Sequence, residues 1–311
     1  AGESLEEARE AKFIETSKAR VALISCASTF PDHSRAGTSR GDTNSRPGLS
    51  PLRYSTEFIV TKEHFDNIKK LKEELNPNKF NEKDRNSLNE ISFSGRNYRV
   101  GEKNEIITKT NPKDLKEIER VVRSSVHMAD YTIVTIHAHE SDQIKSVPAK
   151  FLTEFARKMI DAGADVVVGH GPHVLRGIEI YKEKPIFYSL ANFMFQNETL
   201  LRVPEENYAR YNLGADAQIN DWNAKRYAND TRGFPTEREI WESVVAIPKW
   251  NSGRLFKIEL HPITLGYGKK RTIRGRPTLA NKTLGKKIIT DLIDRSKPFG
   301  TKIDYREGIV L

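Results

Sequence analysis

The sequence of 311 residues contains little sulfur, with one cysteine and three methionines. Cys26 lies inside the apolar run 21–27, so it has no partner for an internal disulfide and is expected to be a small buried hydrophobic residue. No stretch approaches the roughly 18 consecutive apolar residues of a membrane helix, and the first residues lack the pattern of a signal peptide. These absences exclude a disulfide framework and predict no membrane span in the chain.

Charge is plentiful but dispersed. The formal net charge of +9, from 51 Lys and Arg against 42 Asp and Glu, favours an anionic partner such as a phosphate ester, a polyanionic polymer, an anionic lipid or nucleic acid. The clearest basic concentration is residues 269–276, and no known nucleic-acid motif accompanies it. We therefore expect an anionic small molecule or polymer as partner, and no nucleic acid.

Hydrophobic periodicity predicts an α/β fold in which strands alternate with amphipathic helices. Short apolar or β-branched runs predict strands at 21–27, 131–137, 165–169, 177–181, 185–190 and 255–265. Apolar residues at helical spacing predict helices over 61–75, from 111 to about 128, from 148 to 163 and around 284–293. Polar, weakly patterned stretches near 30–56, 76–105 and 197–240 are interpreted as insertions in one domain that spans 1–311.

Two histidine pairs directly follow two of these strands. His137 and His139 lie in HAHESD, and His170 and His173 lie in GHGPH. Strands in successive βα units present their carboxyl ends at one edge of a sheet, so the two pairs are expected to meet there. Neutral imidazole is a good ligand for zinc, iron, manganese or nickel, although histidines at strand ends can also simply cap a core.

A metal bound at this edge would favour hydrolysis, because it activates water and stabilises charge on a phosphoryl or carbonyl oxygen. Glu140 is the preferred candidate for a ligand, a partner of a ligand or a general base. Arg40, Arg46 and Arg53 follow the first strand in a long loop and are candidates for binding a phosphate or carboxylate. A solvated basic loop is the alternative for these arginines, and His33 is a further, weaker ligand candidate.

Several motifs occur together in DAGADVVVGHGPHVLRGIEIYKEKPIFYSLANFMF: GHxPH, then G-x-E-x-Y, then YSLxNF. In this order they resemble the bacterial capsule-synthesis CapA (poly-γ-glutamate capsule protein) family, within the calcineurin-like metallophosphatase superfamily. The resemblance extends over most of residues 1–195. It implies a layered α/β sandwich with two divalent metal ions (Mn, Fe or Zn) at the strand edge. It also implies that His137, His170 and His173 are metal ligands.

The sequence departs from this family pattern at two points. The family form HWGxEY is replaced by HAHESD, so the resemblance does not fix the roles of His139 and Glu140, our candidates for catalysis. The family's upstream Asp, Asn-Leu-Glu and Asn-Asn-His segments do not occur before the AGESLEEAR segment. The resemblance therefore implies a sandwich that lacks its N-terminal βαβ portion, with further metal ligands upstream of Ala1.

These patterns support two main functional hypotheses. The first is a metal-dependent phosphoesterase of capsule or poly-γ-glutamate synthesis, set in the cell envelope or outside the cytoplasm, with other capsule-synthesis proteins as partners. The second is a non-catalytic envelope component that binds or guides an anionic polymer. A mononuclear zinc hydrolase that uses the four histidines alone is a third alternative.

Overall fold

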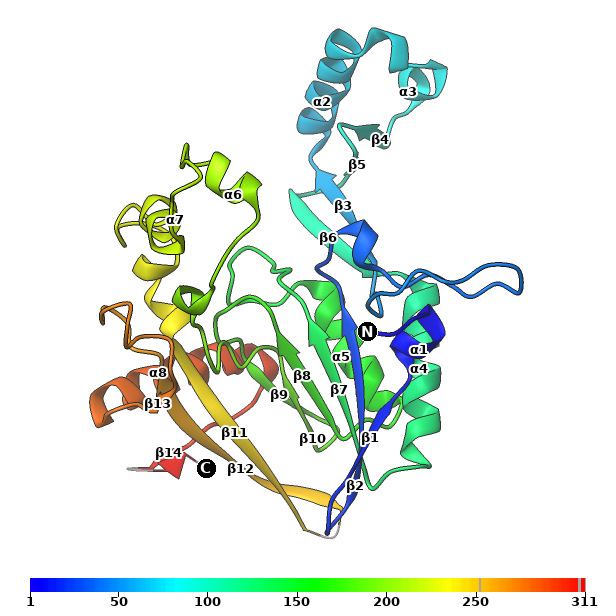
Figure 1. The fold of residues 1–311 in the computed structure, drawn as a ribbon. Coiled ribbons are helices and arrows are strands. Elements are labelled where there is room, and N and C mark those ends of the chain that lie inside the picture. Colours follow the sequence, from blue (N-terminus) through cyan, green and yellow to red (C-terminus); the bar gives the residue numbers. More distant parts are fainter. Residues whose placement is uncertain (252, 307–308, 311) are drawn as a thin grey trace.

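The computed structural model describes residues 1–251, 253–306 and 309–310. At its centre lies a six-stranded sheet with the strand order β1-β2-β7-β8-β10-β9 (Figure 1). Its inner strands run parallel and its two edge strands, β1 and β9, are antiparallel to their neighbours. The bounds are β1 (Lys12–Glu15), β2 (Arg20–Ala27), β7 (Tyr131–His137), β8 (Val166–His170), β9 (Ile178–Tyr181) and β10 (Lys184–Phe187). The parallel strands thus share one carboxyl edge, at which β7 and β8 each end in a histidine.

Two helices cover one face of this sheet, α4 (Pro112–Val126) and α5 (Lys150–Asp161). The side chain of Asn111 caps α4 by accepting hydrogen bonds from the backbone N–H groups of the first turn. In β7, alternate residues are buried, as expected of a β-branched strand between two packed layers. Ile24 and Val134 of the sheet pack with Phe155 of α5 in the larger core.

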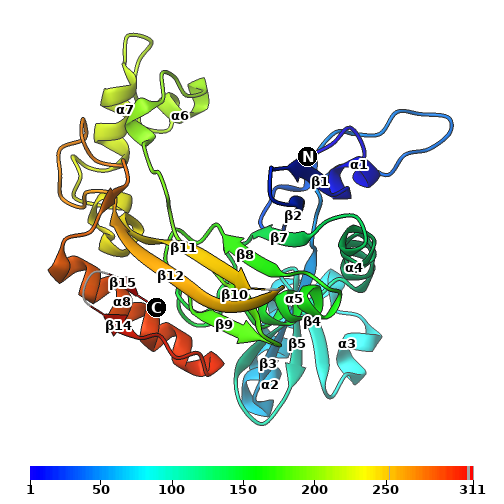
Figure 2. The ribbon, with the colours of Figure 1, turned by 90° about the horizontal axis from the view of Figure 1, so that it is seen from below.

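A second sheet lies over the opposite face (Figure 2). It is built on the long hairpin of β11 (Glu242–Asn251) and β12 (Arg254–Thr264), and β13 (Thr278–Leu279), β14 (Tyr305–Arg306) and β15 (Ile309–Val310) complete it. Helix α8 (Lys282–Ser296) packs beside β12 and β9. Val166 and Phe187 of the central sheet, Leu260 of β12 and Ile288 of α8 share one core. The architecture is therefore a layered, mixed α/β sandwich.

A third, four-stranded sheet projects from the body of the molecule beside the carboxyl edge (Figure 1). Its order is β4-β5-β3-β6, and α2 and α3 complete the projection. Phe65, Phe80 and Ile91 form its own small core. The bounds are β3 (Tyr54–Val60), α2 (Lys62–Leu75), α3 (Glu82–Asn86), β4 (Glu90–Phe93), β5 (Arg96–Val100) and β6 (Glu105–Thr110). The polar stretch 76–105 therefore folds largely into regular elements.

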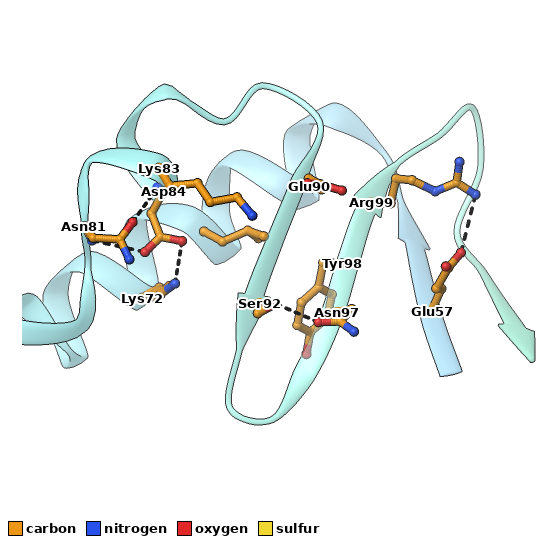
Figure 3. Close-up of a pocket in the computed structure, with 11 residues that line it drawn as sticks. Glu57, Lys72, Asn81, Lys83, Asp84, Glu90, Ser92, Asn97, Tyr98 and Arg99 are labelled. Atoms are coloured by element: carbon orange, nitrogen blue, oxygen red, sulfur yellow. Dashed lines mark hydrogen bonds and ion pairs between the residues drawn. The ribbon is translucent and has the colours of Figure 1, made fainter. Parts of the chain in front are cut away.

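The projection holds a pocket of about 450 Å³ (Figure 3). On its helical wall Lys72 Nζ lies 2.6 Å from Asp84 Oδ1, and both residues are 8% exposed. A capping box with Asn81 fixes the backbone of Asp84. A buried ion pair therefore holds this wall, and it is distant in sequence from the four histidines.

The rest of the chain consists of short elements. These are α1 (Leu5–Arg9), α6 (Glu205–Ala209), α7 (Ile219–Arg226) and 3-10 turns at Asp32–Ser34, Pro77–Lys79, Asn197–Thr199, Phe234–Thr236, Arg238–Trp241 and Lys297–Phe299. The predicted strands and helices named above are all confirmed, with ends that differ by a few residues. Within the described residues, no helix has the length and apolar character needed to cross a bilayer.

Candidate metal centre at the carboxyl edge

The two histidine pairs meet at the carboxyl edge of the central sheet. His137 and His170 are register partners on the adjacent parallel strands β7 and β8, and each is the last residue of its strand. Their Nδ1 atoms lie 3.2 Å apart. The backbone continues the pairing, because Ala138 N donates to the His170 carbonyl at 2.7 Å. Strand register therefore sets the separation of the two imidazoles.

His139 and His173 extend this pair into a row of four rings. Ring centroids are 4.9 Å apart for His137 and His139, 5.2 Å for His137 and His170, and 5.3 Å for His139 and His173. A tight turn brings His173 back to the row, with φ of 125° at Gly171 and 64° at His173 itself. A Cβ atom at Gly171 would lie 3.0 Å from both Ala138 N and His139 Cδ2, so glycine is needed for the close approach of the two motifs.

Asn192, just beyond β10, fixes the tautomer of His173. The Asn192 side-chain oxygen lies 2.9 Å from His173 Nδ1, and the Asn192 amide nitrogen donates to the Ile240 carbonyl at 3.0 Å. The amide oxygen can only accept, so His173 carries its proton on Nδ1. The Nε2 lone pair of His173 is therefore left free for a ligand, as in histidines that bind metals.

Glu140 is held by hydroxyl groups that follow the neighbouring strand β2. Ser28 Oγ donates to Glu140 Oε2 at 2.6 Å, and Thr29 Oγ1 donates to Oε1 at 2.9 Å. Thr29 Oγ1 also accepts a hydrogen bond from the His139 backbone N–H at 2.8 Å. The two hydroxyls thus orient the Glu140 carboxylate through both of its oxygens. Tyr54 lies nearby, and its pKa is raised by burial and then by the Glu140 carboxylate.

Burial and neighbouring charges lower the pKa values of three of the imidazoles. Burial lowers the pKa of His137, and the charge of His173 lowers it further, while Glu140 opposes the shift. The pKa of His139 is lowered by burial and then by His137 and His173. Burial and His137 lower the pKa of His170. Neutral imidazole is the form that binds a metal ion, so the lowered pKa values of His137, His139 and His170 favour that form.

The geometry fits a metal ion at one pair of residues. Two nitrogens bound to one tetrahedral ion at about 2.0–2.1 Å lie roughly 3.3 Å from each other. The separation of 3.2 Å between His137 Nδ1 and His170 Nδ1 is that of a hydrogen bond between the two rings, and it would also suit two adjacent coordination positions. Among residues 1–251, 253–306 and 309–310, no group of three or more His, Cys, Asp or Glu side chains has the geometry of a metal site. A metal ion at this edge would therefore have His137 and His170 as its candidate ligands.

The three candidate arginines have partners of their own. Arg40 binds the Asp42 carboxylate through Nε at 2.9 Å and Nη2 at 3.0 Å, in the loop that extends away from the sheet (Figure 1). Arg46 donates to the Arg35 carbonyl at 2.9 Å. Arg53 forms a bidentate pair with Asp114, at 2.7 and 2.8 Å. None of these three contacts connects an arginine to the four histidines.

Sequence reasoning did not single out Ser28, Thr29, Asn192 or Arg176. The hydroxyls directly follow β2, as the histidines follow β7 and β8, so their place after a strand was an available signal. Asn192 lies in the YSLANF segment, which carried the resemblance but no assigned role. Arg176 contacts backbone carbonyls, and such contacts leave no mark in a sequence pattern.

Comparison with known proteins agrees with the motifs. The model of the family described as bacterial capsule synthesis protein PGA_cap matches residues 1–197, which include all four histidines and Asn192. The chain is 38% identical over 321 aligned residues to the protein y4sH of Sinorhizobium fredii, an alignment that covers 100% of this chain and 68% of y4sH.

Two relatives named for capsule or polymer synthesis match over shorter regions. The capsule biosynthesis protein CapA of Bacillus anthracis is 35% identical over 99 residues, which are 32% of this chain and 23% of that protein. The PGA biosynthesis protein CapA of Bacillus subtilis is 41% identical over 81 residues, 26% of this chain and 21% of its own length. With the family match over residues 1–197, these relationships show that the chain belongs to the bacterial capsule synthesis protein PGA_cap family.

Proposed function

We propose that the carboxyl edge of the central sheet is the metal centre of a metal-dependent phosphoesterase in capsule or poly-γ-glutamate synthesis. The observation that carries the proposal is the pair of neutral imidazoles, His137 and His170, whose Nδ1 atoms lie 3.2 Å apart at the ends of adjacent parallel strands. Membership of the capsule-synthesis family and the layered α/β architecture support it. The proposed fold type is accordingly that of the metallophosphatases.

In this proposal His137 and His170 would hold the ion, and His173, whose Nε2 is free, is the further ligand that the family resemblance implies. A divalent ion of Mn, Fe or Zn bound there supplies Lewis acidity, which activates water and stabilises negative charge on a phosphoryl oxygen. Asn192 maintains the ligating tautomer of His173 through the 2.9 Å contact with Nδ1.

Glu140 is the proposed general base, and His139 is the second catalytic candidate beside it. The Ser28 and Thr29 hydroxyls each occupy one carboxylate oxygen at 2.6 and 2.9 Å. An ionised carboxylate has about four acceptor positions, so two of them remain to take a proton from water. Thr29 also accepts a hydrogen bond from the His139 backbone, so this one hydroxyl contacts both candidates.

The net charge supports an anionic substrate, and the proposed chemistry narrows the choice among anions. A net charge of +9 attracts anions, and phosphoesters or an anionic polymer fit the proposed chemistry. A cell-envelope or extracytoplasmic setting, with other capsule-synthesis proteins as partners, is proposed from family membership alone.

Hydrolysis of bis(p-nitrophenyl) phosphate by the purified chain, supplied in turn with Mn²⁺, Fe²⁺ and Zn²⁺, tests this proposal. We expect weak, metal-dependent hydrolysis, because the family's further metal ligands are not found in this chain, and we expect it to fall to background in the double variant His137→Ala, His170→Ala. His127→Ala is the matched control, because His127 is exposed and lies at the C-terminal end of α4, before β7 begins. Metal-independent hydrolysis, or equal activity in the double variant, would overturn the proposal.

A non-catalytic component that binds an anionic polymer is the second candidate. The observation in its favour is that the described residues offer no side-chain group of three or more metal ligands, while the net charge alone suffices to bind a polyanion. It predicts salt-sensitive polymer binding that the double histidine variant leaves unchanged, with no hydrolysis under any metal. A mononuclear zinc hydrolase would instead retain one zinc per chain, lost in the double variant.

A further inference from the structure

Arg176 lies in an unusual environment for a charged side chain. It is 1% exposed and is the largest fully buried side chain described. Its hydrogen-bond partners are backbone carbonyls: Nε donates to Lys145 at 3.1 Å, and Nη2 donates to His139 at 3.2 Å and Glu140 at 2.9 Å. Burial lowers the pKa of Arg176 to about 10, and the charge of Glu140 opposes this shift.

Burying a guanidinium is costly unless its donors are well used. Arg176 Nη1 has no hydrogen-bond partner among the described residues, so full satisfaction of the side chain does not explain its place. The position of the Arg176 side chain is better explained by its three carbonyl partners. All three belong to the segment that follows β7. This segment, 138–149, contains no helix or strand.

Arg176 also connects the two histidine motifs. It lies three residues beyond His173, and its backbone N–H donates to the Ser189 carbonyl at 3.1 Å, which ties it to the stretch after β10. From there its side chain reaches back to His139 and Glu140. One side chain thus couples the backbone of the first motif to that of the second.

We propose that Arg176 is a positioning residue of the histidine cluster, whose guanidinium holds the backbone at His139 and Glu140 in register with His170 and His173. The inference rests on the proposed metal centre for its function, and on the hydrogen bonds above for its geometry. Arg176 touches neither substrate nor metal in this role. It acts through the placement of the neighbouring residues.

Three variants test the inference, with Mn²⁺ and Zn²⁺ as probes in calorimetric titrations. Arg176→Met removes the charge and the donors while keeping most of the side-chain volume, and Arg176→Lys keeps the charge but cannot donate to three separated carbonyls. Lys72→Met is the matched control, because Lys72 is a buried cation paired with Asp84 in the projecting sheet (Figure 3). Both methionine variants are expected to lower the melting temperature.

Metal affinity separates positioning from general stability. We expect Arg176→Met to weaken binding about 10–100-fold, as is usual for loss of a residue that orients ligands, with Arg176→Lys in between. Lys72→Met should bind as the wild type does. Equal affinity in wild type and Arg176→Met, or an equal loss in Lys72→Met, would overturn the inference.

A second measurement keeps the inference separate from the proposed function. If the wild type binds neither metal, the proposed metal centre fails, and amide hydrogen exchange of the metal-free proteins then tests the positioning. We expect exchange over residues 139–147 to be faster in Arg176→Met and unchanged in Lys72→Met. Unchanged exchange in Arg176→Met would show that Arg176 does not hold this segment.

Discussion

Asp114 connects the start of α4 to two arginines, and its replacement should be among the most damaging in the chain. Asp114 is 0% exposed. It accepts hydrogen bonds from Arg9 Nη2 at 2.7 Å, and from Arg53 Nε at 2.7 Å, Nη2 at 2.8 Å and the backbone N–H at 2.9 Å. Arg9 is itself 4% exposed and also pairs with Glu117, so Asp114→Ala leaves a buried cation with one carboxylate.

The expected loss of stability in Asp114→Ala follows from the burial of its partners. Removing one partner of a buried ion pair costs about 3–5 kcal/mol, because the other charge stays desolvated. The Arg53 side chain is 41% exposed, so water screens its share and Arg53→Ala should cost only about 1 kcal/mol. Urea denaturation at pH 7 measures the loss of stability in each variant. The loss in the double variant Asp114→Ala, Arg53→Ala should not equal the sum of the two single losses, because the two residues are in contact.

The stability that Asp114 contributes decreases as the pH falls. Burial raises the pKa of Asp114, but the hydrogen bonds from Arg53 and Arg9 outweigh it and hold the pKa below its ordinary value. The stabilisation is therefore complete above the unfolded-state pKa of about 3.9 and is lost as pH falls through the lower folded-state pKa. Wild type and Asp114→Ala should converge in stability in that acid range. A wild-type advantage that is absent at pH 7, or that persists unchanged through this range, would refute the reasoning.

Three further predictions concern the histidine cluster. Asn192→Ala should weaken Mn²⁺ or Zn²⁺ binding about 10–100-fold in a calorimetric titration, because the tautomer of His173 is no longer fixed, and unaltered affinity would count against that role. Gly169→Ala should destabilise the chain by at least about 1–3 kcal/mol in urea denaturation, because its Cβ would collide with the Tyr188 backbone carbonyl, and a neutral effect would show that β8 and β10 can separate freely. Glu140→Gln should lower the rate constant of phosphodiester hydrolysis about 10²–10⁴-fold with metal affinity retained, and an unchanged rate would remove it as general base.

The elements around the candidate site could be predicted because their residues carry local signals. The β-branched run of β7 and the apolar run of β8 allow little except buried strands, and each is followed at once by histidines. Adjacent parallel strands bring the two pairs to one edge, and the observed register pairs His137 with His170. The sequence therefore predicted which side chains meet, and where.

The supporting contacts could not be predicted, for physical reasons. Arg176 contacts carbonyl groups, which every residue has, so its partners have no compositional signature. Arg53 lies in a basic loop, where pattern alone cannot distinguish an anion-binding arginine from one paired with Asp114 across 61 residues of sequence. From sequence alone, residues 76–105 of the projecting sheet are interpreted as a polar insertion, because the small core is formed by a few scattered residues such as Phe80 and Ile91.

The proposed function depends on metal binding by the histidines at the carboxyl edge, with His137 and His170 as the essential pair. X-ray absorption at the metal edge of the Zn²⁺- or Mn²⁺-loaded chain tests it most directly, with His127→Ala as control. We expect nitrogen neighbours at about 2.0–2.2 Å with the outer-sphere scattering of imidazole, reduced in the variant that lacks both His137 and His170. An imidazole signal that is absent in the wild type, or equal in the double variant, would contradict it.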